Sequence, residues 1–133
     1  MKRVVLADTG PLYAALDPSD QYHRRAQEEL ERLTHERREV IIVYPILFES
    51  YSLVLYRLGK QTASSWLNET MHGASFVNPT AEHYREAADI LQAFADQRIT
   101  LFDATIAVLA RRLGLHVWTY DHHFDVMRVP VWR

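Results

Sequence analysis

Cysteine is absent from the 133-residue chain. This absence excludes disulfide bonds, thiolate nucleophiles and zinc sites built on cysteine ligands, and it fits the reducing environment of the cytoplasm. If the protein binds a metal ion, the ligands must therefore be oxygen atoms or imidazole nitrogen atoms.

Long hydrophobic runs are missing too. The longest one, VIIVYPILF at residues 40–48, is interrupted by a proline and is far shorter than the about 20 residues that a membrane-spanning helix needs. The apolar stretch that precedes Asp8 is too short to form the core of a signal peptide. We therefore expect a complete cytoplasmic protein that does not associate with a membrane.

A strong charge of either sign is also missing, because 15 basic residues are balanced by 17 acidic ones and the formal net charge is -2. This charge provides no overall attraction to nucleic acid, so binding to RNA or DNA would depend on local groups or on a bound cation. With 48% hydrophobic residues, the chain is large enough to bury the core of one domain, which we expect to span residues 1–133.

Short apolar runs alternate with longer helical patterns along the chain. Strands separated by helices indicate a parallel sheet with helices on both faces, since parallel neighbours need a crossover connection. The predicted fold class is α/β, with a central parallel sheet of about five short strands flanked by helices. The predicted strands span residues 3–7, 40–43, 75–77, 116–119 and 129–132. The predicted helices span approximately residues 11–16, 20–38, 45–58, 61–71 and 80–95. A last predicted helix carries Asp103 and ends at Gly114.

Acidic residues stand near the ends of several predicted strands. Asp8 directly follows the first strand, Asp121 follows HVWT after one intervening residue, and Glu49 lies early in the helix after the second strand. In parallel sheets, functional sites collect beyond the carboxyl ends of the strands. We therefore expect these three carboxylates at one edge of the sheet.

Each acid also has an ordinary local interpretation. Asp103 in LFDATIAVLA can cap the helix that follows, Asp121 can cap the turn HHFDVM, and Asp8 can bond its own backbone in a turn. Glu49 in the apolar stretch ILFESYSLVL needs a partner if it is buried, but it could instead face solvent or pair with Arg57. The residues alone leave these alternatives open.

Two adjacent histidines, His122 and His123, stand between Asp121 and Asp125 and suggest a transition-metal site. However, adjacent side chains point in different directions on regular structure, and an isolated pair of histidines at the surface is usually exposed. We therefore expect these two side chains to face solvent rather than to converge on an ion.

The acids fall within four segments, which are DTGPLYAALDPSDQYHRRA near the start, ES at residues 49–50, FDATIAVLARRLG and WTYDHHF. In this order and over nearly the whole chain, the segments resemble the four acidic motifs of the PIN-domain ribonucleases and, at this length, the stand-alone toxins of VapBC toxin–antitoxin pairs. The chain departs from the pattern at His123, where many members have a further aspartate. The catalytic and metal-binding residues that the resemblance implies are Asp8, Glu49, Asp103 and Asp121, and the implied supporting residues are Thr9 and Thr119.

The resemblance also implies a chemistry and partners. Such a protein is an endoribonuclease that hydrolyses RNA phosphodiester bonds with Mg²⁺ or Mn²⁺, ions that prefer carboxylate oxygen ligands. Four converging carboxylates would otherwise repel one another. The implied partners are an RNA substrate, a cognate antitoxin protein and a second copy of the chain, which would form a homodimer through the aromatic and aliphatic surface of residues 45–67.

Two other functions remain open. The first is a catalytically silent PIN-like binding module that only pairs with a partner protein. The second is an aspartate-phosphoacceptor enzyme, in which the nucleophile also follows the first parallel strand. Such an enzyme needs a lysine near the phosphate in the second half of the chain, whereas the only lysines are Lys2 and Lys60. Metal binding that depends on Asp103 would separate the nuclease from both alternatives.

Overall fold

The structure is a computed structural model that describes residues 3–133, so Lys2 lies outside the described residues. The strands are β1 (Val4–Ala7), β2 (Glu39–Val43), β3 (Ser75–Val77) and β4 (His116–Trp118). The helices are α1 (Thr9–Ala14), α2 (His23–His35), α3 (Tyr44–Leu58), α4 (Lys60–Gly73), α5 (Ala81–Ala93), α6 (Leu101–Leu113) and α7 (His123–Val126).

The four strands form one parallel sheet in the order β3-β2-β1-β4. The register pairs Val5 with Val40 of β2, and Leu6 with Val117 of β4. The predicted α/β class with a central parallel sheet is therefore confirmed. Because every strand runs the same way, all carboxyl ends meet at one edge, and β1 and β4 lie side by side there although more than a hundred residues separate them.

The prediction of a fifth strand at residues 129–132 is wrong. This segment pairs with β4 through one isolated bridge, between Val117 and Val131. The Pro130 carbonyl accepts from the Val117 amide at 2.9 Å, and the Trp132 amide donates to the Val117 carbonyl at 2.8 Å. A proline has no N–H to extend the ladder, so the pairing stops after one bridge.

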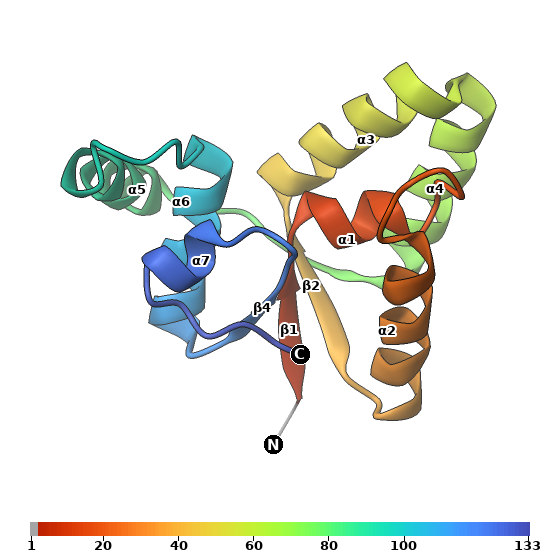
Figure 1. The fold of residues 1–133 in the computed structure, drawn as a ribbon, viewed down its shortest axis with the longest axis horizontal. Coiled ribbons are helices and arrows are strands. Elements are labelled where there is room, and N and C mark those ends of the chain that lie inside the picture. Colours follow the sequence, from red (N-terminus) through yellow and green to blue (C-terminus); the bar gives the residue numbers. More distant parts are fainter. Residues whose placement is uncertain (1–2) are drawn as a thin grey trace.

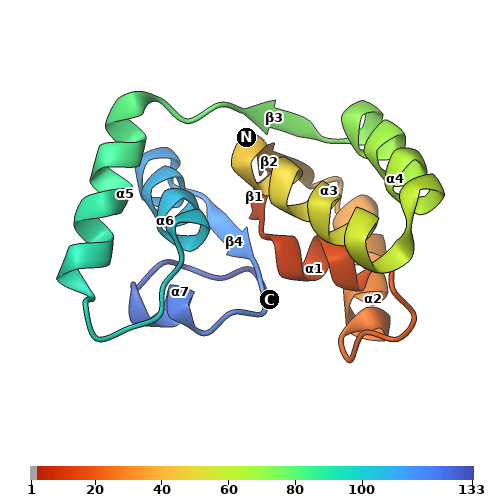
Figure 2. The same ribbon diagram turned by 90° about the horizontal axis from the view of Figure 1, so that it is seen from above.

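Helices cover the sheet on two sides. In Figure 1, α5, α6 and α7 lie to the left of the strands, and α1, α2, α3 and α4 lie to the right. Figure 2 shows the same division from above, with α6 beside β4 and α3 beside β2. Among the helices of residues 3–133, none combines the length and the apolar character needed to cross a membrane.

Helix α6 is the most deeply buried of these helices, since every residue from Asp103 to Ala110 is buried. Small side chains such as Ala104 and Ala107, both fully buried, let the helix pack closely against its neighbours, which include α5 and β4. Gly114 ends the helix with a left-handed backbone at φ 65°, and the chain then turns into β4. This packing fixes the first turn of α6 at the carboxyl edge of the sheet.

Glu29 connects α2 to the end of β4. Its carboxylate accepts hydrogen bonds from the indole N–H of Trp118, at 3.1 Å, and from the hydroxyl of Tyr120. The guanidinium of Arg25 lies 3.4 Å from the second oxygen. A buried carboxylate is costly unless it is well paired, and this one has three partners.

Replacing Glu29 with alanine is expected to lower the free energy of unfolding by about 2–3 kcal/mol, because it leaves the buried indole N–H of Trp118 without its acceptor. Glu29→Gln keeps an oxygen acceptor and should cost less. The control is Glu28→Ala, which removes only a surface pair with Arg24 and should have little effect. Urea denaturation of the three variants measures these free energies of unfolding. Equal stability of the two alanine variants would contradict the structural role of Glu29.

Candidate active site

Asp8 sits where β1 ends and α1 begins. Its backbone N–H still donates to the Trp118 carbonyl at 3.0 Å, which continues the pairing of β1 with β4. One carboxylate oxygen accepts from the Thr9 amide and the other from the Thr119 hydroxyl, both at 2.8 Å. Asp8 is therefore the N-cap of α1, and it is also tied to β4 by a contact that no local pattern contains.

Glu49 lies in the second turn of α3 and reaches the same edge of the sheet. Its carboxylate accepts a short hydrogen bond from the Thr9 hydroxyl, whose oxygen in turn accepts from the Ser50 hydroxyl at 3.2 Å. Arg57, the alternative partner considered from the sequence, instead lies over the Tyr13 ring at 5.2 Å from its centroid. The structure thus directs Glu49 toward Thr9 and the end of β1.

Asp103 is both a capping residue and part of the acidic edge. The N-cap of α6 is Thr100, whose hydroxyl accepts from the Asp103 amide at 3.1 Å, while the Asp103 carboxylate accepts from the Thr100 amide at 3.4 Å. These reciprocal bonds form a capping box, in which Asp103 occupies the third helical position rather than the N-cap. The Thr-x-x-Asp spacing of residues 100–103 was the sequence signal for Thr100.

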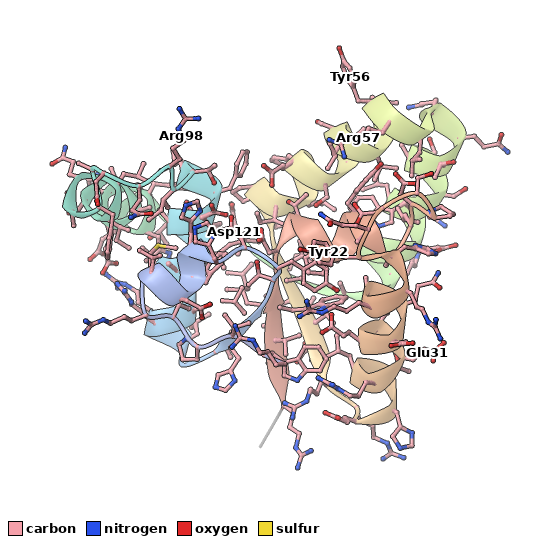
Figure 3. All side chains as sticks on the ribbon, viewed as in Figure 1. Tyr22, Glu31, Tyr56, Arg57, Arg98 and Asp121 are labelled. Carbon is pink, nitrogen blue, oxygen red and sulfur yellow. The ribbon has the colours of Figure 1, made fainter. Side chains whose placement is uncertain are left out.

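Asp121 follows β4 and is held by its own turn. Its amide donates to the Thr119 hydroxyl at 3.0 Å, and one of its carboxylate oxygens accepts from the His123 amide at 2.9 Å. Figure 3 shows Asp121 near the middle of the molecule, between the helices on the left and those on the right. Thr119 therefore links two acids, because it donates to Asp8 and accepts from the backbone of Asp121.

All four acids line one cleft of about 860 Å³. Burial, together with the nearby charges of Asp103 and Glu49, raises the pKa of Asp8 to about 7, although the hydrogen bonds from Thr119 and Thr9 lower it. Burial also raises the pKa of Asp103 to about 6, with the adjacent Asp121 carboxylate as the next cause. The cleft therefore holds more negative charge than it can stabilise by itself.

Positive side chains do not relieve this charge. Among the described residues that line the cleft, none is a lysine or an arginine. The Lys60 ammonium contacts the Tyr51 hydroxyl at 3.2 Å and does not line the cleft, which leaves an aspartate-phosphoacceptor mechanism without its lysine in the described chain. A set of carboxylate oxygens in a cleft with no side-chain cation fits a hard divalent cation.

Tyr22 and Tyr120 form a wall of the cleft that the sequence did not reveal. Their ring centroids lie 4.7 Å apart, and the Arg25 guanidinium lies 4.4 Å from the Tyr120 centroid. Tyr120 is held by Glu29, a residue 91 positions away in the chain. Contacts over such separations leave no local sequence signal.

The chain belongs to the PIN domain family, whose pattern matches residues 5–130. Ribonuclease VapC26 of Mycobacterium tuberculosis is 30% identical over 128 residues, which cover 93% of this chain and 92% of that protein. The resemblance inferred from the four acidic segments is thus confirmed for the family.

Solved structures share the fold. VapC20 of Mycobacterium tuberculosis, described as a sarcin–ricin loop cleaving toxin, superimposes with a TM-score of 0.84 at 20% identity and covers 97% of this chain and 98% of that one. VapBC2 of Rickettsia felis, solved bound to a DNA fragment from its promoter, has a TM-score of 0.75 at 17% identity, with coverage of 98% and 97%. The parallel sheet with its flanking helices is therefore the arrangement of this fold.

Proposed function

We propose that this protein is a metal-dependent endoribonuclease of one domain, which hydrolyses RNA phosphodiester bonds in the cytoplasm as the toxin of a toxin–antitoxin pair. The observation that carries the proposal is the cleft itself, where Asp8 and Asp103 are buried beside Glu49 and Asp121 with no side-chain cation among the described lining residues. The relative named Ribonuclease VapC26 supports the nuclease class. The sarcin–ricin loop cleavage ascribed to VapC20 supports RNA as the substrate class.

In this proposal Asp8, Asp103 and Asp121 hold a Mg²⁺ or Mn²⁺ ion, and Glu49 completes the acidic set. A bound ion of this kind supplies charge neutralisation of the scissile phosphate and lowers the pKa of a water molecule. The protein supplies orientation, since the Thr119 hydroxyl fixes Asp8 and the Thr9 hydroxyl fixes Glu49. Asp8 stands at the end of a strand, Glu49 and Asp103 lie in packed helices, and Asp121 is held by a hydrogen-bonded turn. The ligands are therefore preorganised.

Asp103→Asn tests the proposal directly. Asparagine removes one charge from the cluster but keeps an oxygen that can accept from the Thr100 amide, so the fold should survive. We expect Mn²⁺ binding, measured by isothermal titration, and cleavage of RNA both to be lost. The control is Thr100→Ala, which removes the hydroxyl cap, should cost about 1 kcal/mol of stability and should leave Mn²⁺ binding in place. If Asp103→Asn cut RNA at the original rate, Asp103 would be only a capping residue.

Glu49→Gln is expected to slow RNA cleavage at least about tenfold with little change in the free energy of unfolding. Glutamine keeps an acceptor for the Thr9 hydroxyl but removes the charge. The matched control is Glu69→Gln, on the exposed side of α4, which should change neither quantity. Single-turnover cleavage and urea denaturation check both parts, and a Glu49→Gln protein with full activity would remove Glu49 from the site.

We also propose that an antitoxin protein and a second copy of the chain bind this protein. The homodimer would use α3 and α4, where Phe48 and Tyr56 are 64% and 93% exposed. Tyr56 projects away from the molecule at the top of Figure 3. Sedimentation at micromolar concentration should show a dimer that Tyr56→Glu weakens, and a monomer under the same conditions would contradict this part of the proposal.

A further inference from the structure

Asp121, His122 and His123 form a compact group of metal-ligating side chains beside the cleft. One ligand atom from each residue lies within 4.8 Å of the others. The Nδ1 atoms of His122 and His123 lie 3.8 and 2.9 Å from Oδ1 of Asp121. The imidazole rings face each other, with centroids 4.3 Å apart and planes inclined by 36°. The expectation that these adjacent side chains diverge is therefore wrong. The expected exposure to solvent is confirmed for His122, at 75%, but not for His123, at 14%.

The turn before α7 explains this convergence. His122 is the N-cap of α7, with φ -66° and ψ -16°, and His123 is its first residue. Asp121 folds back onto this turn, because its Oδ1 accepts from the His123 amide at 2.9 Å. The carboxylate oxygen is thus held between the two imidazoles, close enough to the Nδ1 atom of each for all three atoms to bind the same ion.

His123 gives the group an unsatisfied ligand atom. Its side chain is 14% exposed, and its Nδ1 is buried with no hydrogen-bond partner. That nitrogen lies near Asp121 Oδ1 but outside hydrogen-bonding geometry. A buried polar atom without a partner is costly, and a cation bound to both atoms would remove this cost.

The spacing and the donor types favour a transition-metal ion. With bonds of about 2.0–2.1 Å, a tetrahedral Zn²⁺ ion separates its ligand atoms by about 3.3–3.4 Å. The two distances from Asp121 Oδ1, 2.9 and 3.8 Å, lie on either side of this value. Two imidazoles and one carboxylate suit Zn²⁺, whereas Mg²⁺ prefers oxygen ligands only.

The surroundings leave the fourth coordination position of a tetrahedral ion open to water. Asp121 and His122 line a hollow of about 250 Å³ that is separate from the acidic cleft, although Asp121 lines both. Two arginines also line this hollow, but Arg133 is paired with Asp125 at 3.3 Å and Arg25 with Glu29 at 3.4 Å. Their charges are therefore partly neutralised.

We propose that Asp121, His122 and His123 form a second cation site, which binds Zn²⁺ through one carboxylate oxygen and two imidazole nitrogens and is distinct from the all-oxygen cluster of the cleft. This site does not depend on the nuclease function. Asp121 belongs to both groups, so an ion at the histidines would restrain a residue of the acidic cleft.

Zn²⁺ binding to the full-length, untagged protein tests the proposal. Isothermal titration is performed with Mg²⁺ in large excess, so that oxygen-only ligands are already occupied. We expect one Zn²⁺ ion per chain, with an affinity that falls about tenfold or more in both His122→Ala and His123→Phe. His122 is exposed, so its replacement leaves the fold intact, and phenylalanine preserves the ring shape of His123. The matched control is His35→Ala on α2, which should bind Zn²⁺ as the original protein does. Asp103→Asn removes a charge next to Asp121 and should weaken Zn²⁺ binding less than either histidine variant does.

Three results would overturn the proposal. The first is the absence of Zn²⁺ binding in excess Mg²⁺. The second is Zn²⁺ binding that the two histidine variants leave unchanged, which would place the ion elsewhere. The third is Zn²⁺ binding that Asp103→Asn abolishes, which would assign the ion to the acidic cleft. None of these readouts uses RNA, so failure of the nuclease proposal would not be mistaken for failure of this one.

Discussion

Replacing Asp8 with asparagine is expected to abolish RNA cleavage and, at the same time, to stabilise the metal-free protein at neutral pH. Asp8 is 7% exposed, and its pKa is raised to about 7, so the fold disfavours its ionised form. Asparagine carries no charge and still accepts from the Thr9 amide. We expect cleavage to fall by at least about a hundredfold and the free energy of unfolding to rise by about 2–4 kcal/mol at pH 7.

The two effects, lower cleavage and higher stability, have opposite directions, and this distinguishes a metal ligand from a residue that only supports the fold. A residue that only supports the fold would lose stability and activity together when replaced. The matched control is Asp20→Asn, which lines the same cleft and accepts from the Tyr22 amide outside the acidic cluster. It should leave cleavage unchanged. If Asp8→Asn destabilised the metal-free protein, or cut RNA at the original rate, the proposed role of Asp8 would be rejected.

The stability of the metal-free protein is expected to fall as the pH rises from about 4 to about 7. The folded-state pKa values of Asp8 and Asp103, about 7 and about 6, both exceed the ordinary aspartate value of 3.8. The folded state therefore binds these protons more tightly than the unfolded state, and the resulting stability is lost as the two groups ionise. Asp17 and Glu36 have lowered pKa values, so their contributions change at and below their ordinary values of 3.8 and 4.5, at the acidic end of this range.

Urea denaturation at a series of pH values, with EDTA present, measures this dependence. Added Mg²⁺ or Mn²⁺ should restore stability near pH 7, because an ion that binds only the folded state replaces the lost protons as the neutralising charge. Asp8→Asn should flatten the pH dependence. A metal-free stability that is constant or increases between pH 4 and 7 would contradict the burial of these carboxylates without a cationic partner.

Local patterns in the sequence determined most of the secondary structure. The apolar run before Asp8 is β1, and Gly114 ends α6 as expected, because both depend on backbone preferences over a few residues. The predicted helix at residues 20–38 is shorter in the structure, since its first turn is replaced by hydrogen bonds to Asp20. Asp103 also fits its local pattern as a capping residue.

The sequence predicted the acids of the candidate site and their place at one edge of the sheet, but not the contacts that hold them there. The contacts that give these acids their properties come from other parts of the chain, as in Thr119 with Asp8 and Thr9 with Glu49. They exist because β1 lies between β2 and β4, an order that residue patterns do not specify. The raised pKa of Asp8 is likewise a consequence of burial among these elements.

The sequence by itself determined most of the strands and helices and the acids that follow them, because periodicity, capping and turn chemistry act between near neighbours. Only the tertiary structure decided which acids share a cleft, that Glu29 holds Trp118 and Tyr120, and that the rings of His122 and His123 face each other. The physical reason is that charge, burial and hydrogen bonding act through space. Their strength depends on distances that the order of strands and the packing of helices set, and not on separation along the chain.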